Sequence, residues 1–120
     1  MNLFQSGNFV LHSGAHSNFK INCNALTDED WKALASIVSK KFKFGKVWGI
    51  PRGGTKLANA LLSYITEGRA IIVDDVFTTG NSMEEARRVF GEDSIGVVVF
   101  ARHTPPLWIT PIFKLTIKED

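Results

Sequence analysis

The chain has 120 residues, of which 44% are hydrophobic and 22% are charged. This length suits one domain with a single core, so we expect residues 1–120 to form one unit. The net charge of +2 is too small to indicate a nucleic-acid or membrane-surface partner. The only cysteine, Cys23, excludes an intrachain disulfide and fits a reducing cytoplasm. The start of the chain lacks the features of a signal peptide, and no apolar run is long enough for a membrane span.

The first part of the chain predicts a small hairpin and then a helix. Apolar residues at 9–11 and 19–21 indicate two short strands around the polar segment 13–18. Thr27 is a suitable helix N-cap, because acidic residues follow it in the first turn. Apolar residues then recur at helical spacing from Trp31 onward, and Gly45 ends the element.

The rest of the chain alternates between strands and helices. Strands are predicted at 47–50, 70–73 and 95–100, helices at 55–64 and 82–90, and a final edge strand at 112–117. This order predicts an α/β fold with a Rossmann-like parallel sheet, preceded by the small N-terminal hairpin as a hood. Ligands of such sheets bind beyond the carboxyl ends of the strands. Three segments lie there: 51–54, 74–82 and 102–103.

Residues 71–82 contain the most informative pattern in the chain. An apolar strand leads into Asp74 and Asp75, and a loop of small and hydroxyl residues follows before the next helix. The loop residues proposed to bind a ligand are Thr78, Thr79, Gly80, Asn81 and Ser82. Backbone N–H groups, hydroxyls and the helix dipole all favour an anion there. The two carboxylates predict a ligand that also has hydroxyls or a divalent metal, and a ribose phosphate bound with Mg²⁺ has both.

Residues 71–82 resemble the signature with which type I phosphoribosyltransferases bind 5-phosphoribosyl 1-diphosphate (PRPP). That signature has four apolar residues, two acidic residues, an apolar pair, then Thr-Thr-Gly or a close variant and a hydroxyl residue. In this chain Ala70 precedes Ile71 as the first of the four apolar residues. The resemblance implies the phosphoribosyltransferase fold for the parallel sheet and its hood. It also implies that Asp74 and Asp75 act in catalysis, hold the ribose hydroxyls and bias the metal Mg²⁺.

The segment Pro51-Arg52-Gly53-Gly54 follows another predicted strand and opens a helix. It looks like the diphosphate-binding loop of phosphoribosyltransferases, where two glycines allow the backbone to approach an anion and an arginine contacts two oxygens. The same segment, taken alone, is also typical of an ordinary strand-to-helix turn. The resemblance assigns Arg52, Gly53 and Gly54 to the leaving diphosphate.

The two ends of the chain favour different bases. Residues 9–19 look like the opening of orotate phosphoribosyltransferases, although His12 stands where that family has lysine. Residues 105–111 are similar to the Trp-Ile segment of xanthine–guanine phosphoribosyltransferases, in which the aromatic ring stacks on a purine. We therefore expect His12, Phe19 and Trp108 to face the base. A structural alternative is that Trp108 packs the last strand onto the core.

One expected part of such an enzyme is missing. The interval between Gly54 and Asp74 has 19 residues, whereas the family usually has a further strand and a long flexible catalytic loop there. The sequence thus predicts a minimal phosphoribosyltransferase that transfers phosphoribose from PRPP to a nucleobase, with orotate favoured and a purine possible. It is expected to form a homodimer. The alternative is a non-catalytic PRPP or nucleotide sensor on the same fold.

Overall fold

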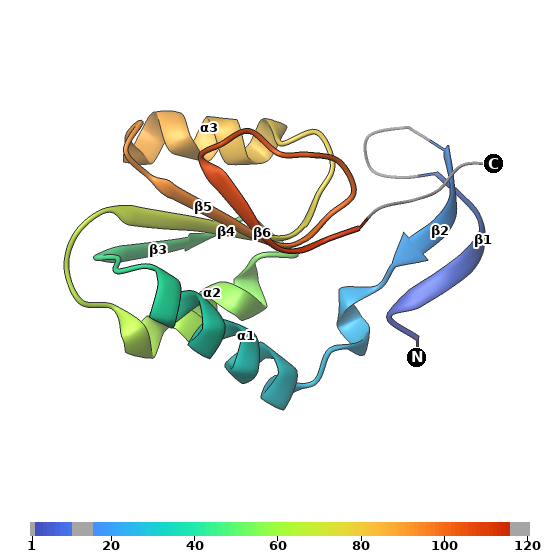
Figure 1. Cartoon of the computed structure of the whole chain (residues 1–120), viewed down its shortest axis with the longest axis horizontal. Helices are drawn as coiled ribbons and strands as arrows, with labels where there is room; N and C mark the ends of the chain where they lie inside the picture. Colours follow the sequence, from blue (N-terminus) through green and yellow to red (C-terminus); the bar gives the residue numbers. More distant parts are fainter. Residues whose placement is uncertain (1, 11–15, 116–120) are drawn as a thin grey trace.

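The structure is a computed structural model that describes residues 2–10 and 16–115. Figure 1 shows a β-hairpin beside a parallel sheet that has helices on both faces. The strands are β1 (Phe4–Val10), β2 (His16–Ile21), β3 (Lys46–Gly49), β4 (Ala70–Phe77), β5 (Ile95–Ala101) and β6 (Ile109–Lys114). The helices are α1 (Asp28–Lys41), α2 (Thr55–Leu61) and α3 (Asn81–Phe90), with single 3₁₀ turns η1 (Cys23–Ala25) and η2 (Leu62–Tyr64).

The hood is the antiparallel pair of β1 and β2, as predicted. Both strands are longer than expected, because pairing starts at Phe4 with Ile21 and reaches Val10 with His16. Residues 13–15 of the predicted polar segment lie outside the described residues, whereas residues 16–18, also predicted as loop, belong to β2. Phe4 of β1 packs edge-on against Phe100 of β5, with ring centroids 5.8 Å apart. The hood is therefore attached to the carboxyl half of the main sheet.

The main sheet has the order β3-β4-β5-β6, and all its neighbouring strands are parallel. This confirms the predicted α/β fold class. The carboxyl ends of the strands point toward the hood (Figure 1). The last strand lies at an edge, as predicted, but begins at Ile109 and ends at Lys114. The sequence did not predict a strand at Ile109, because prolines come before and after it. In the structure Ile109 is buried and pairs with Gly96 of β5.

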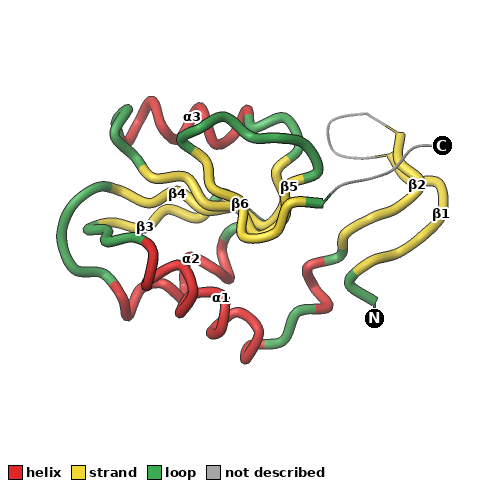
Figure 2. Tube along the Cα trace, in the orientation of Figure 1, coloured by secondary structure: helices red, strands yellow, loops and turns green. Residues whose placement is uncertain are grey.

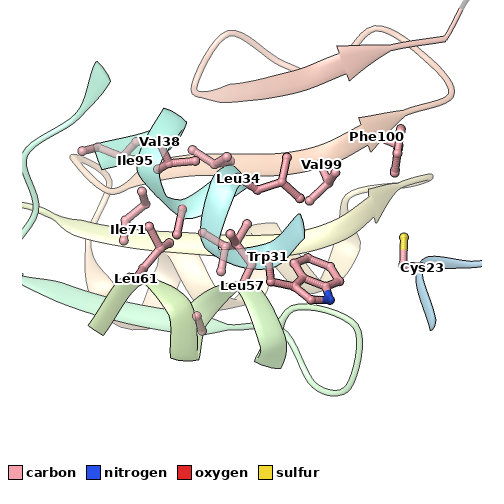
Figure 3. Close-up of a cluster of buried hydrophobic side chains, with 14 of the residues drawn as sticks. Cys23, Trp31, Leu34, Val38, Leu57, Leu61, Ile71, Ile95, Val99 and Phe100 are labelled. Carbon is pink, nitrogen blue, oxygen red and sulfur yellow. The ribbon is translucent and has the colours of Figure 1, made fainter. Parts of the chain in front are cut away.

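Side chains alternate between the two faces of the sheet and form two apolar clusters. Ile71 and Val73 of β4 pack with α1 and α2, whereas Ile72 packs on the opposite face with Met83 of α3. Figure 2 shows α1 and α2 on one side of the sheet and α3 on the other. Figure 3 shows the larger cluster, in which Trp31 of α1 lies beside α2. Both faces are thus covered, as the apolar strands predict.

The two helical crossovers have opposite hands. Strands β3, β4 and β5 follow one another in a single direction across the sheet, yet α2 and α3 lie on opposite faces. One connection is therefore right-handed and the other left-handed, which is rare among parallel strands. Residues 55–69 contain α2, η2 and no strand, so nothing in that interval extends the sheet beyond β3.

Local signals explain the ends of the first helix. The Thr27 hydroxyl accepts a hydrogen bond from Asp30 N at 3.2 Å, and Asp30 Oδ2 accepts one from Thr27 N at 2.8 Å. This reciprocal capping box confirms Thr27 as the N-cap. Lys40 and Lys41 lie in the last turn, where cations suit the helix dipole.

Candidate active site

A cleft of about 740 Å³ lies between the hood and the carboxyl ends of β3, β4 and β5. All three segments singled out in the sequence contribute to it. Its lining residues are Phe9, Lys20, Ile21, Ile50, Pro51, Arg52, Asp74, Asp75, Val76, Thr78, Thr79, Asn81, Ser82 and Arg102. A cleft of this size can hold a phosphorylated sugar together with a ring.

The acidic pair lies inside β4 rather than at its end. The sequence predicted a strand over 70–73, but pairing with β5 continues to Phe77, opposite Ala101. Asp74 Oδ1 accepts a hydrogen bond from Asp75 N at 2.8 Å, and Asp75 Oδ1 accepts one from Val76 N at 2.7 Å. The strand continues past Asp74 because β4 stays paired with β5, through Val76 opposite Phe100 and Phe77 opposite Ala101.

Asp74 has a strongly shifted acidity. Burial, together with its hydrogen-bonding and charge interactions with Asp75, raises the pKa of Asp74 from 3.8 to about 8. Ionising Asp74 beside the carboxylate of Asp75 is thus unfavourable. A bound cation, or hydrogen bonds from ribose hydroxyls, would relieve the repulsion between the two carboxylates.

The acidic pair supplies only some of the ligands that a metal ion needs. Among the described residues no group of three or more His, Cys, Asp or Glu side chains could hold a metal. Two neighbouring carboxylates suffice for Mg²⁺, because this ion commonly takes one or two protein carboxylates and fills its other positions with substrate oxygens and water. Asp74 and Asp75 therefore suit a metal that arrives with a phosphorylated ligand.

The loop after β4 forms a small hollow that opens from the cleft. This hollow has a volume of about 60 Å³ and is lined by residues 76–83 and by Asp74. Gly80 precedes α3 with φ of 80°, a left-handed conformation that favours glycine, and a Cβ there would overlap the Phe77 ring. The first turn of α3 has no side-chain cap at Gly80; the Asn81 N–H donates to Thr79 Oγ1 at 3.4 Å, and the N–H groups of Ser82 and Met83 can bind an anion.

The loop between β3 and α2 lies beside the acidic pair. Arg52 is exposed and lines the cleft, whereas Gly54 is buried under Ile50. Gly53 lies directly against the carboxyl group of Asp75, so position 53 has no space for a side chain. The peptide between Pro51 and Arg52 is cis. The two predicted halves of the site, the acidic pair and the arginine–glycine loop, are thus in contact.

The hood supplies the other wall of the cleft, together with the end of β5. Arg102 is only 9% exposed and donates a hydrogen bond from Nη2 to the Phe19 carbonyl oxygen at 3.2 Å. Its guanidinium carbon lies 3.9 Å from the centroid of the Phe19 ring. Phe19 therefore supports Arg102 rather than lining the cleft itself. Lys20 lines the same wall, which makes this side of the cleft cationic.

Sequence reasoning noted the position of Arg102 but gave it no role, and it missed Lys20. The signal for Arg102 was a basic residue directly after a continuous apolar strand, where parallel sheets place their ligands. The signal for Lys20 was weaker, because an exposed lysine on a hairpin strand is common.

Of the two other residues predicted to face the base, only Trp108 lies among the described residues. His12 lies outside the described residues. Trp108 is not among the residues that line the cleft: its Nε1 donates to Glu84 Oε1 at 2.7 Å, and Arg87 lies 4.8 Å from the ring centroid. The ring also covers Gly96 of β5. The structure thus favours the packing alternative for Trp108, which joins the last strand to α3.

Cys23 lies near the acidic pair but does not suit nucleophilic chemistry. Burial raises the pKa of its thiol to about 12, and the charges of Asp75 and Asp74 add to the effect. The thiol is therefore protonated and unreactive at neutral pH.

Comparisons with solved structures identify the fold. The UMP synthase of Leishmania donovani is similar at a TM-score of 0.69 with 20% identity, over 94% of this chain and 33% of that chain. The orotate phosphoribosyltransferase from Aeropyrum pernix is similar at a TM-score of 0.64 with 24% identity, over 83% of this chain and 76% of that chain. The orotate phosphoribosyltransferase of Mycobacterium tuberculosis H37Rv, solved in complex with Fe(III) dicitrate, is similar at a TM-score of 0.67 with 15% identity. The match covers 93% of this chain and 89% of that chain.

The chain spans only a third of the length of the Leishmania UMP synthase, but most of the length of the two orotate phosphoribosyltransferases. A scan of family models and a search of curated proteins found no match. The four-stranded parallel sheet with its hood is a phosphoribosyltransferase fold. In fold the chain is similar to orotate phosphoribosyltransferases.

Among the described residues, no helix is both long enough and apolar enough to cross a membrane.

Proposed function

We propose that this protein transfers phosphoribose from PRPP to a nitrogen of a nucleobase and releases diphosphate, in the cytoplasm and with Mg²⁺. The observation that supports this most directly is the single cleft in which the acidic pair, the Thr78–Ser82 loop and Arg52 meet. These groups match the three parts of PRPP: ribose hydroxyls, a 5′-phosphate and a diphosphate.

In the proposed reaction a base nitrogen loses its proton to solvent and bonds to C1 of the ribose, while the bond from C1 to the diphosphate oxygen breaks and the diphosphate leaves with the electron pair. Positive charge develops on the sugar, and the nearby carboxylate of Asp75 stabilises it, joined by that of Asp74 once a bound cation has displaced its proton. The N-terminus of α3 and the hydroxyls of residues 78–82 hold the 5′-phosphate, and Arg52 binds the leaving diphosphate. When bound, Mg²⁺ supplies charge neutralisation for the diphosphate.

An anionic base is the acceptor that the cleft favours. Arg102 and Lys20 place two cations on the wall formed by the hood and β5, opposite the acidic pair. A carboxylate on the base would pair with that wall, since a guanidinium binds a carboxylate through two parallel hydrogen bonds. Orotate has such a carboxylate, whereas uracil and the common purines do not.

The test is to incubate the protein with PRPP, Mg²⁺ and each base in turn and to measure diphosphate release and nucleotide formation. We expect orotate to react faster than the other bases, and Asp75→Asn to abolish the reaction. Asp93→Asn, an exposed carboxylate in the α3–β5 connection, is the matched control and should leave the rate unchanged. Absence of nucleotide with every base would reject the catalytic proposal.

A non-catalytic PRPP or nucleotide sensor is the second candidate. It is favoured by the interval between Gly54 and Asp74, where the described residues form α2 and η2 and no loop that covers the cleft. Calorimetry separates the two candidates: a sensor binds PRPP with Mg²⁺ but releases no diphosphate with any base.

A further inference from the structure

The two edges of the main sheet differ in how well they are protected. An edge strand presents unpaired backbone groups and can pair with another strand, so proteins usually block it. At one edge, β6 has Pro111 in its middle, which removes a backbone donor. At the other edge, β3 has no proline, and no described strand pairs with its free side. The β3 edge is therefore the one that is open to pairing.

An apolar groove lies along this open edge. It has a volume of about 440 Å³ and is formed by β3 and α3, with Trp48, Val89 and Phe90 as its main apolar residues. Trp48 is 42% exposed and Val89 is 78% exposed, and the Trp48 ring lies 5.7 Å from that of Phe90. An exposed cluster of large apolar side chains beside a free strand edge is typical of an interaction surface.

The charges at the two ends of the groove are opposite, so they would pair with those of a second, antiparallel copy of β3. Lys46 begins β3 and lies on the same face as Trp48, since side chains two residues apart share a face. Glu85 of α3 lines the groove beside Ile50, just beyond the opposite end of β3. Neither residue has an ion-pair partner among the described residues. A second β3 running antiparallel would bring its Lys46 to Glu85, and the reverse pair would form by symmetry.

We propose that a second copy of this chain docks on the β3 edge, with the two β3 strands antiparallel about a twofold axis near Trp48. The two sheets become one continuous sheet, and α3 of each copy lies on the same face. Trp48, Val89 and Phe90 of the two copies cover one another, and Lys46 of each copy pairs with Glu85 of the partner subunit. Because Ile50, Pro51 and Ser82 line both this groove and the cleft, the interface borders the proposed active site.

Sedimentation of the full chain over a range of concentrations tests the proposal. We expect a dimer, and Trp48→Ala should raise its dissociation constant about 100-fold or more, because a central tryptophan is lost from both sides of the interface. Lys46→Glu and Glu85→Lys should each raise it about fivefold or more, since two ion pairs become two repulsive pairs. Circular dichroism shows whether each variant is folded.

The double variant Lys46→Glu/Glu85→Lys gives the sharpest result. It restores opposite charges only if Lys46 of one copy faces Glu85 of the other, so its dissociation constant should return to within about threefold of wild type. Lys32→Glu and Glu29→Lys, which reverse exposed charges on α1 on the opposite face of the sheet, are the matched controls and should dimerise normally. A chain that is monomeric at about 100 μM, or a dimer that tolerates all three single changes, would overturn the proposal.

Discussion

Gly53 and Asp75 are in direct contact across the candidate active site: a Cβ at position 53 would overlap the carboxyl group of Asp75. The contact joins the β3–α2 loop to β4, so the loop assigned to the diphosphate and the carboxylate assigned to the ribose depend on each other for position. Glycine is required at position 53 for space rather than for a special backbone angle, because its φ is not positive.

Gly53→Ala should therefore displace the Asp75 carboxyl group and weaken PRPP binding. We expect it to destabilise the fold by about 1–3 kcal/mol, the usual cost of overpacking. In the Asp75→Ala background the same change should cost much less, because the overlapping atoms are gone. Thermal unfolding of the four proteins in this double-mutant cycle measures the coupling, and equal costs in both backgrounds would show that the contact does not matter.

The raised pKa of Asp74 predicts that the metal-free protein loses stability as the pH rises. Asp74 takes up its proton near pH 3.8 when unfolded and near pH 8 when folded, so between these values the folded state binds more protons. The stabilisation is complete below about pH 4 and is lost by about pH 8. Each unit corresponds to about 1.4 kcal/mol, so the total is on the order of a few kcal/mol.

Asp74→Asn isolates this effect, because asparagine stays neutral and its oxygen can still accept the bond from Asp75 N. In EDTA, the variant should be more stable than wild type at pH 8, by several degrees in Tm, and about equal at pH 4. A difference in Tm that does not change with pH would contradict the assignment.

Arg52 is predicted to bind the diphosphate and not the 5′-phosphate, since it lies on a different loop from residues 78–82. Arg52→Ala should weaken PRPP and inorganic diphosphate by about tenfold to 100-fold, the range for a lost charge-assisted hydrogen bond, and should spare a nucleoside monophosphate. Lys56→Ala is the control, because Lys56 is an exposed cation on the adjacent helix that does not line the cleft. Equal losses for all three ligands would place Arg52 elsewhere.

The sequence was sufficient to predict the parallel sheet and the segments that meet at its carboxyl ends, because buried strands and helix starts have local signals. Thr27 is an example: its hydroxyl and the acidic residues after it indicate a helix start without any tertiary information. The extension of β4 past Asp74 was not predictable in this way, since it depends on pairing with β5.

Trp108 is a residue for which the local sequence led to a wrong expectation. Two prolines before it suggested a stiff loop that presents the ring to a ligand, but the ring packs between Gly96 and α3 and its Nε1 bonds Glu84. Such partners are distant in sequence, and no local pattern reveals them. The cationic wall formed by Arg102 and Lys20 was also hidden, because the two residues meet only through tertiary contacts.

Trp108→Phe tests this position directly. It should lower stability by about 1–2 kcal/mol, because the hydrogen bond to Glu84 and part of the contact with Arg87 are lost. The apparent KM for the base should stay the same. Glu84→Gln keeps the size of the acceptor and should cost less in Tm than Trp108→Phe. A KM that rises several-fold in Trp108→Phe with unchanged stability would return this residue to the base pocket.

Arg102 has two roles that can be separated by substitution. Its charge faces the cleft, and its planar group stacks on Phe19 and bonds the Phe19 carbonyl oxygen. Arg102→Met removes the charge and keeps much of the volume, whereas Arg102→Lys keeps the charge and loses the planar stack. Both variants should loosen the hood to a similar extent.

Binding of two nucleotides that differ in one carboxylate measures the role of the charge. We expect wild type to prefer orotidine 5′-monophosphate over uridine 5′-monophosphate, and Arg102→Met to lose about tenfold or more of that preference. Arg102→Lys should keep most of it, since an ammonium still attracts the carboxylate. PRPP affinity with Mg²⁺ should change equally in both variants, because it depends on the acidic pair and the Thr78–Ser82 loop. If Arg102→Met keeps the full preference, the carboxylate does not bind at this wall. If wild type shows no preference at all, the base is not anionic.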